Sequence, residues 1–404
     1  MNRGFLRAGH LPTLIAAFFY FDVSFMVWVI LGPLAVFIAK DLHSSPAEKG
    51  LMVATPVLAG AALRIPSGVF ADHLKPRLAG IIMQAIVIAG LAAFWAFGVP
   101  NFQATLALGL VLGVAGASFA VALPLASYWY PPEHQGAALG IAGAGNSGTV
   151  LAALFAPSLA VLLGWRNVLG LTIVPLAIVL ALFVLLAKDS PRSPPPKSLK
   201  EYADVLRAGD AWWLMAFYCV TFGGFVGLSS FLPIYFNDQY ALSPVAAGYC
   251  TAAAVFAGSF IRPFGGAVAD RVGGVKALSF VYGLVAVLAL ILSRGIASLS
   301  LALPIIIVIM GALGAGNGAV FQIAPQRFPR NVGVVTGLVG ATGGAGGFYL
   351  AASLGVAKQM TGGYGAGIAI FACLALAALA ALSGVRARWR GAGLDRSALA
   401  AANA

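Results

Sequence analysis

Acidic residues are scarce in this chain of 404 residues, which has 12 Asp and Glu against 24 Lys and Arg. Charged residues make up only 9% of it, too few to cover the surface of a soluble protein of this size. The three cysteines are isolated, which excludes a disulfide framework. The four histidines fall in predicted loops or near the N-terminus, and no nucleophile–base or metal-ligand cluster accompanies them. We therefore expect no enzyme, no metal and no cofactor.

Apolar residues dominate, with 61% of the chain hydrophobic and a mean hydropathy of +0.95. A helix needs about 20 apolar residues to cross a bilayer, and only helices or closed barrels satisfy their backbone there. The long apolar runs lack the alternation of strands, so they favour helices. The sequence predicts an all-α membrane protein with twelve transmembrane helices, near 12–38, 47–71, 78–98, 102–129, 136–163, 166–187, 211–236, 245–269, 277–293, 299–325, 332–357 and 364–385.

The net charge of +12 follows the predicted topology. With both termini cytoplasmic, seventeen basic residues lie on the cytoplasmic side and two, Arg64 and Arg262, lie inside spans. This positive-inside bias predicts a multi-pass protein of the inner (cytoplasmic) membrane, in contact with lipid and not with nucleic acid. The opposite side holds only five basic residues: Lys40, Lys49, Arg166, Arg294 and Lys358.

The chain repeats itself with a shift of 198 residues, which places Arg64 on Arg262. Two halves in the same order and orientation predict parallel six-helix bundles, with a binding site between them near the membrane midplane. We expect bundles at 1–187 and 211–404, joined by a stiff, Pro-rich cytoplasmic loop at 188–210. The same shift also matches Gly68 with Gly266, Asp72 with Asp270, Phe19-Tyr20 with Phe217-Tyr218, and Gly145 and Gly148 with Gly343 and Gly346.

Arg64 and Arg262 lie deep in the apolar segments 51–72 and 248–270, whose only carboxylates, Asp72 and Asp270, are at the far ends. A buried guanidinium costs about 2.5–3.5 kcal/mol at the bilayer centre, so it needs a cavity and a negative partner. A guanidinium fork matches a planar oxyanion. We expect the two arginines to clamp an anionic substrate; the alternative is that each pairs with helix carbonyls or a distant acid.

Two glycine-rich stretches mark the fifth and eleventh spans, GIAGAGNSGTV (140–150) and GLVGATGGAGGFYL (337–350). Glycine permits close contact between membrane helices and leaves backbone open to a small ligand. Packing is the main role expected for most of them. Asn146 differs, because an amide in such a face needs a partner and can donate to an anion.

The segments GVFADHLKPR (68–77) and GGAVADRVGGVK (265–276) follow the second span of each half. They resemble the signature loop of the major facilitator superfamily, at both expected places. The resemblance implies the twelve-helix fold of that superfamily. It also implies a role in conformational change for Gly68, Asp72, Gly266, Asp270 and Arg271.

A narrower resemblance follows from GAGNSG (143–148) and GATGGAGG (340–347), which look like the signature of the nitrate/nitrite porter family. Segments 21–28, 115–131, 217–227 and 314–329 also resemble that family. The family has a further asparagine at Ala142 in some members, so the number of amides around the anion is open. The resemblance implies an anion site of Arg64, Arg262, Asn146, Tyr218, Phe119, Phe222, Gly143 and Gly344, with the two Phe rings against the faces of the anion. Asn317, equivalent to Phe119 by the repeat, is a further candidate.

Asp22 is the one acidic residue well inside the spans of the first half. It is a candidate to carry a coupling proton, to hold Arg64 when the site is empty, or to bind nearby backbone; Tyr218 and Tyr20 are the other candidates for the proton. The resemblance implies import of nitrate, and nitrite, by a monomer. Proton symport is favoured, and nitrate/nitrite exchange or transport of a carboxylate or phosphate are the alternatives.

Overall fold

The computed structural model describes residues 5, 8–193, 196–197, 199–328 and 331–391. Within these ranges it contains helices and no strands, and twelve helical segments are long and apolar enough to cross a membrane. The predicted fold class is confirmed, with boundaries within a few residues of those expected. The segments are Leu11–Asp41, Pro46–Leu74, Pro76–Phe97, Phe102–Ser127, Ala138–Leu163, Trp165–Leu186, Gly209–Tyr240, Pro244–Val272, Gly274–Leu292, Leu299–Arg327, Gly333–Thr361 and Gly365–Arg386.

Four spans of the first half are interrupted within the membrane. The fifth is broken by a 3₁₀ turn, η1 (Ala144–Ser147), inside the GAGNSG stretch. Glycine weakens a helix, and a 3₁₀ turn within a span often marks a functional hinge. The helices of this half are α2 (Leu11–Trp28), α3 (Leu31–Asp41), α4 (Pro46–Leu74), α5 (Pro76–Phe97), α6 (Phe102–Gly116), α7 (Phe119–Ser127), α8 (Pro132–Gly143), α9 (Gly148–Leu163), α10 (Trp165–Leu171) and α11 (Ile173–Leu186).

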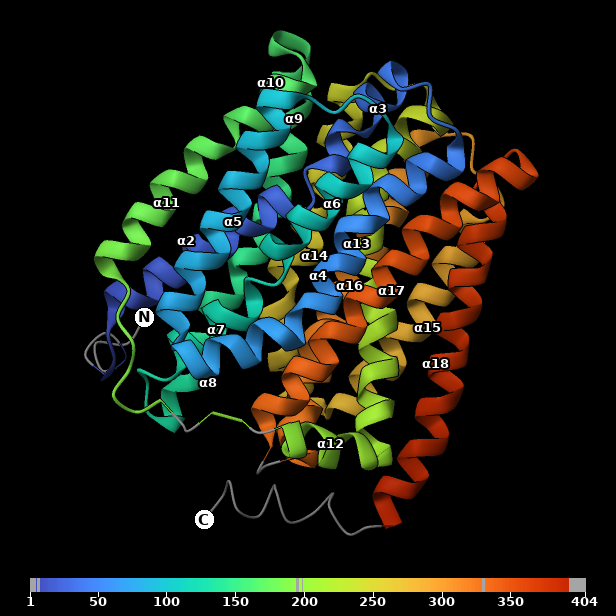
Figure 1. The fold of residues 1–404 in the computed structure, drawn as a ribbon. Helices are drawn as coiled ribbons and strands as arrows, with labels where there is room; N and C mark the ends of the chain where they lie inside the picture. Colours follow the sequence, from blue (N-terminus) through green and yellow to red (C-terminus); the bar gives the residue numbers. More distant parts are fainter. Residues whose placement is uncertain (1–4, 6–7, 194–195, 198, 329–330, 392–404) are drawn as a thin grey trace.

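The spans of the second half are continuous helices. Figure 1 shows them, coloured lime to red, mainly on the right, with most of the blue-to-green helices of the first half on the left and α4 crossing from the upper right to the lower left. The halves meet where α3, α4 and α9 contact α13, α14 and α17. The helices of this half are α13 (Gly209–Tyr240), α14 (Pro244–Val272), α15 (Gly274–Leu292), α16 (Leu299–Arg327), α17 (Val332–Thr361) and α18 (Gly365–Gly391).

The repeat is visible in the ends of α4 and α14. Ser45 caps α4 in a capping box with Glu48, and Ser243, 198 residues later, caps α14. Both helices end at equivalent residues with positive φ, Lys75 at 72° and Gly273 at 93°. The two arginine-bearing helices are therefore the same unit built twice.

The signature segments are helical where a loop was expected. Gly68 and Asp72 lie in the last turns of α4, and Gly266, Asp270 and Arg271 lie in those of α14. The helices continue because their chain reversals come only at Lys75 and Gly273.

The prediction of a loop throughout 188–210 is also wrong, because α12 (Leu199–Arg207) is a helix. Figure 1 shows α12 across the lower end of the second-half helices. Beyond the prolines, charge pairs support this helix: Lys197 with Glu201 at 3.7 Å and Arg207 with Asp204 at 3.1 Å. Residues 1–4, 6–7 and 392–404, whose basic residues contribute to the predicted orientation, lie outside the described ranges.

Candidate anion-binding site

A cavity of about 460 Å³ lies between the two halves. Its walls come from α7, α8 and η1 of the first half and from α14, α16 and α17 of the second. Arg262, Asn146, Phe119 and Gly143, all predicted site residues, lie in this wall. Asp270 lines it too, so the cavity extends toward the C-terminal end of α14.

Arg64 lies on α4 and is 3% exposed. Its Nη1 donates to the carbonyl oxygen of Gly340 on α17, across the interface of the halves. Its Nε and Nη2 have no hydrogen-bond partner, and within the described ranges the side chain forms no ion pair. A buried guanidinium with two free donors is costly alone and well suited to a planar anion.

Three aromatic rings surround the Arg64 guanidinium. Its Cζ lies 5.6 Å from the ring centroid of Trp28, 5.3 Å from that of Phe119 and 5.1 Å from that of Phe222. Such cation–π contacts contribute about 0.5–2 kcal/mol each. The rings thus stabilise the charge without using its hydrogen-bond donors.

Arg262 on α14 is only half-buried and faces the cavity. Its Nη2 donates to the hydroxyl of Tyr218 at 3.4 Å, and its Cζ lies 5.6 Å from the ring centroid of Phe321. No carboxylate pairs with it among the residues described. Of the two alternative partners considered from the sequence, a distant acid is not seen for either arginine among the described residues, whereas a helix carbonyl is seen for Arg64, at Gly340.

Aromatic contacts connect the two arginines. Tyr218, which binds Arg262, stacks on Phe222 with centroids 5.0 Å apart and planes 6° apart, and Phe222 contacts Arg64. On the other side, Phe119 stacks on Phe321 at 6.5 Å. The chain thus brings Tyr218, Phe119 and Phe222 together with both arginines.

Asn146 lies in η1, is 1% exposed and has no partner for its Oδ1. Gly143 precedes the turn, and a Cβ added there would meet no atom within 4 Å, so its backbone is open. Gly344 lies elsewhere: an added Cβ would be 2.6 Å from the Cβ of Ala61, so this glycine serves the contact of α17 with α4. Asn317 is buried on α16 and does not line the cavity.

Asp22 is 6% exposed and accepts a hydrogen bond from Ser147 Oγ at 2.6 Å. It therefore holds η1, next to Asn146, and does not hold Arg64 in this conformation. Tyr20 packs against Phe183 within the first half, with ring centroids 4.7 Å apart, away from the cavity.

The signature residues lie near the C-terminal ends of α4 and α14. Asp72 accepts from the backbone N–H of Lys197 at 3.3 Å, which connects the end of α4 to the connector. Gly68 lies near Tyr202 of α12, since an added Cβ would be 3.8 Å from its hydroxyl. Gly266 and Asp270 line the cavity, and Arg271 is exposed.

The sequence reasoning missed Trp28, Gly340, Phe321 and Ser259. Phe321 follows Asn317 by one helical turn, and Ser259 precedes Arg262 by three residues, so helical spacing from a candidate would have pointed to both. Nothing comparable marks Gly340 among the many glycines of α17.

The comparisons with known proteins agree with this architecture. The sequence profile of the Major Facilitator Superfamily matches residues 14–351. Its members are transporters and not enzymes. The fold is similar to that of a bacterial homologue of the human lysosomal transporter Spinster, in an inward-facing and occupied conformation, with a TM-score of 0.73 and 18% identity over 96% of this chain and 98% of that one.

Two curated relatives are similar over most of their length. The "Nitrite extrusion protein" of Bacillus subtilis is 32% identical, over 88% of this chain and 89% of that protein. The "Probable nitrate/nitrite transporter NarK2" of Mycobacterium tuberculosis is 33% identical, over 84% of this chain and 87% of that protein. This multi-pass membrane protein therefore belongs to the nitrate/nitrite porter family of the major facilitator superfamily.

Proposed function

We propose that this protein is a monomer that transports nitrate across the cytoplasmic membrane by alternating access, and that it also accepts nitrite as a substrate. The observation that carries the proposal is the state of Arg64: it is buried and ringed by aromatics, and two of its nitrogens have no partner. Flat rings and planar donors fit a flat, weakly hydrated oxyanion. The names of the relatives point to the same substrates.

The proposed cycle moves two bundles, 1–187 and 211–404, about the site, with 188–210 as the connector. The anion joins Arg64 of one bundle to Arg262 of the other, which offsets their mutual repulsion and favours closure. The 3₁₀ turn η1 beside Asn146 is the proposed hinge of the first bundle. The cavity extends toward the C-terminal end of α14, which the positive-inside rule assigns to the cytoplasmic side.

We propose import coupled to protons, with Asp22 as the carrier. Nitrate is the base of a strong acid, so a protein group must carry the proton. Asp22 accepts a hydrogen bond from Ser147, the neighbour of Asn146. Protonation of Asp22 would therefore alter η1, the turn that places the amide of Asn146 at the cavity.

Nitrate/nitrite exchange is the second candidate, and the unpaired arginines favour it. An empty site with two positive charges and no ion-paired carboxylate among the described residues resists reorientation, whereas a loaded site does not.

Uptake of ¹⁵N-labelled nitrate into proteoliposomes tests the proposal. Accumulation driven by an inward proton gradient supports symport, and uptake that requires internal nitrite supports exchange. Absence of uptake under both conditions, with uptake of acetate or phosphate instead, would reject nitrate transport.

A further inference from the structure

Ser259 is a polar side chain of α14 for which the proposed site has no role so far. It is 4% exposed, its Oγ has no hydrogen-bond partner in the part of the chain described, and it lines the cavity. Helical serines and threonines usually bond the carbonyl four residues before. Thr251 of the same helix does so, to Ala247 at 2.8 Å. The hydroxyl of Ser259 instead remains unused.

Ser259 is placed beside Arg262 by helix geometry. Residues three apart lie on one face of a helix, and both residues are in the cavity wall. The helix is fixed here, because a Cβ added to the adjacent Gly258 would be 2.6 Å from Phe225 and 2.7 Å from the carbonyl oxygen of Met310. The two residues therefore lie on the same face of α14 in the cavity wall, where the Oγ of Ser259 is buried and has no partner among the described residues.

The repeat shows that this hydroxyl belongs to one half only. The equivalent of Ser259 in α4 is Ala61, 198 residues earlier. Ala61 packs against Gly344 of α17, and Arg64 one turn later donates to Gly340. The first half thus encloses Arg64. The second half instead leaves the hydroxyl of Ser259 without a partner beside Arg262, which faces the cavity.

We propose that Ser259 contacts the substrate, donating a hydrogen bond to an oxygen of the anion bound at Arg262, and that it favours oxyanions over chloride. The proposal rests on the proposed function. A hydroxyl donates from a fixed position and can match one oxygen of a planar oxyanion, whereas a spherical chloride accepts from any direction and gains less from that match. Loss of a hydrogen bond to a charged group weakens binding by roughly tenfold or more.

The test compares Ser259→Ala with Ser259→Thr, which keeps the hydroxyl, and with Ser230→Ala as a matched control. Ser230 is 1% exposed and its Oγ also has no partner, but it does not line the cavity. Nitrate uptake into proteoliposomes gives KM and kcat, and competition gives the inhibition constant of chloride. Nitrate-dependent thermal stabilisation of the purified protein measures binding without transport.

For Ser259→Ala we expect KM for nitrate to rise roughly tenfold, with chloride inhibition and kcat nearly unchanged. Ser259→Thr and Ser230→Ala should keep the wild-type KM. An unchanged KM and thermal shift in Ser259→Ala, or an equal rise in Ser230→Ala, would overturn the role of Ser259. If Ser259→Ala fails to fold, the KM for nitrate is measured for Ser259→Cys instead. A thiol is a weaker donor than a hydroxyl, so this KM should also rise. Wild-type protein that takes up no nitrate rejects the proposed function itself.

Discussion

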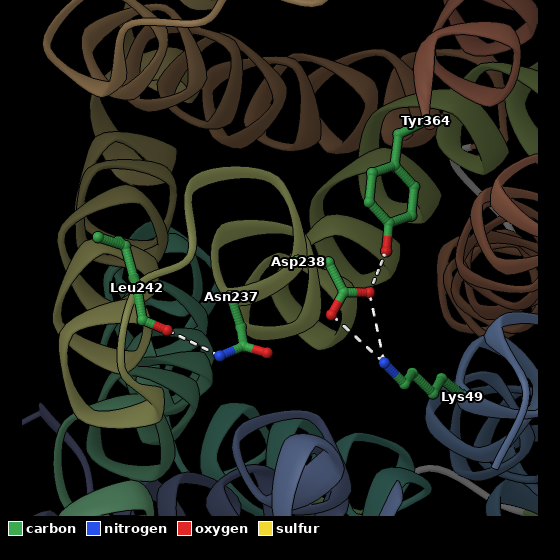
Figure 2. A network of polar contacts seen from close by, with 5 residues as sticks. All are labelled: Lys49, Asn237, Asp238, Leu242 and Tyr364. Carbon is green, nitrogen blue, oxygen red and sulfur yellow. Dashed lines mark hydrogen bonds and ion pairs between the residues drawn. The ribbon is translucent and has the colours of Figure 1, made fainter. Parts of the chain in front are cut away.

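The Nζ of Lys49 lies 3.3 Å from Oδ1 of Asp238, which joins the start of α4 in the first half to the end of α13 in the second. Figure 2 shows that Tyr364 points to the same carboxylate, and its hydroxyl donates to Oδ2 at 2.7 Å. This network lies at the opposite end of α4 from the signature residue Asp72. The halves are thus held together at one end, while the cavity extends toward the other.

Breaking the Lys49–Asp238 pair should favour opening at this end. The side chains are only 22% and 16% exposed, so the pair should exceed a typical surface pair of about 0–1 kcal/mol. We expect Asp238→Asn to shift the equilibrium between contact and separation of the two halves at this end. The shift should be at least fivefold toward separation, which corresponds to about 1 kcal/mol. Distances between spin labels at Lys40 and Ala297, in a cysteine-free background, would measure it.

Lys49→Ala should give the same shift, and the double variant no more than either change alone. Additive effects would show that the two residues do not act as a pair.

Arg64→Lys and Arg262→Lys should each lower kcat/KM for nitrate by about tenfold to a hundredfold, because lysine keeps the charge and loses the fork. Nitrate and nitrite uptake would be measured for both. Arg166 is exposed and lies over the ring of Trp165, so Arg166→Lys is the matched control and should leave kcat/KM for nitrate unchanged. Full transport by both variants would reject bidentate recognition.

Gly344→Ala should reduce stability and transport together. The new methyl would lie 2.6 Å from Ala61 Cβ and 3.2 Å from its Cα, an overpacking cost of about 1–3 kcal/mol. Gly337→Ala, on the same helix with no atom within 4 Å of the added Cβ, should melt at or above the wild-type temperature. Equal melting temperatures for the two variants would mean that α4 and α17 do not pack this closely.

Asp22→Asn should abolish nitrate accumulation driven by a proton gradient while nitrate/nitrite counterflow continues. The amide cannot carry the proton, but its oxygen can still accept from Ser147. Both modes would be measured in the same proteoliposomes. Ser147→Ala keeps the carboxyl group but removes its contact with η1, so it should also reduce accumulation driven by the proton gradient. Gradient-driven accumulation by Asp22→Asn would remove Asp22 as carrier and favour exchange.

Much of the fold could be predicted because hydrophobic length alone selects membrane helices. The shift of 198 residues that aligned Arg64 with Arg262 also aligns the starts and ends of α4 and α14 in the structure. The loop expected at 188–210 was wrong in part, because a short amphipathic helix on a surface depends on local charge pairs and has no long apolar signal.

Site residues could be predicted where a polar or charged side chain stands out in an apolar span. Arg64, Arg262 and Asn146 are conspicuous in apolar spans, whereas Phe321, Trp28 and Ser259 are ordinary there. Asp22 had three possible roles from sequence, and its hydrogen bond with Ser147 argues only against pairing with Arg64 in this conformation.

The amino-acid sequence by itself determined the twelve helices, their repeat and the presence of two arginines deep in apolar segments, since hydropathy, spacing and charge are properties of the chain. Only the tertiary structure decided which arginine is enclosed and which faces the cavity. That difference arises because Arg64 meets Gly340 and a cage of rings from distant helices, while α14 leaves Arg262 and Ser259 in the cavity wall. Contacts between segments far apart in the chain have no counterpart in local pattern, so folding alone sets them.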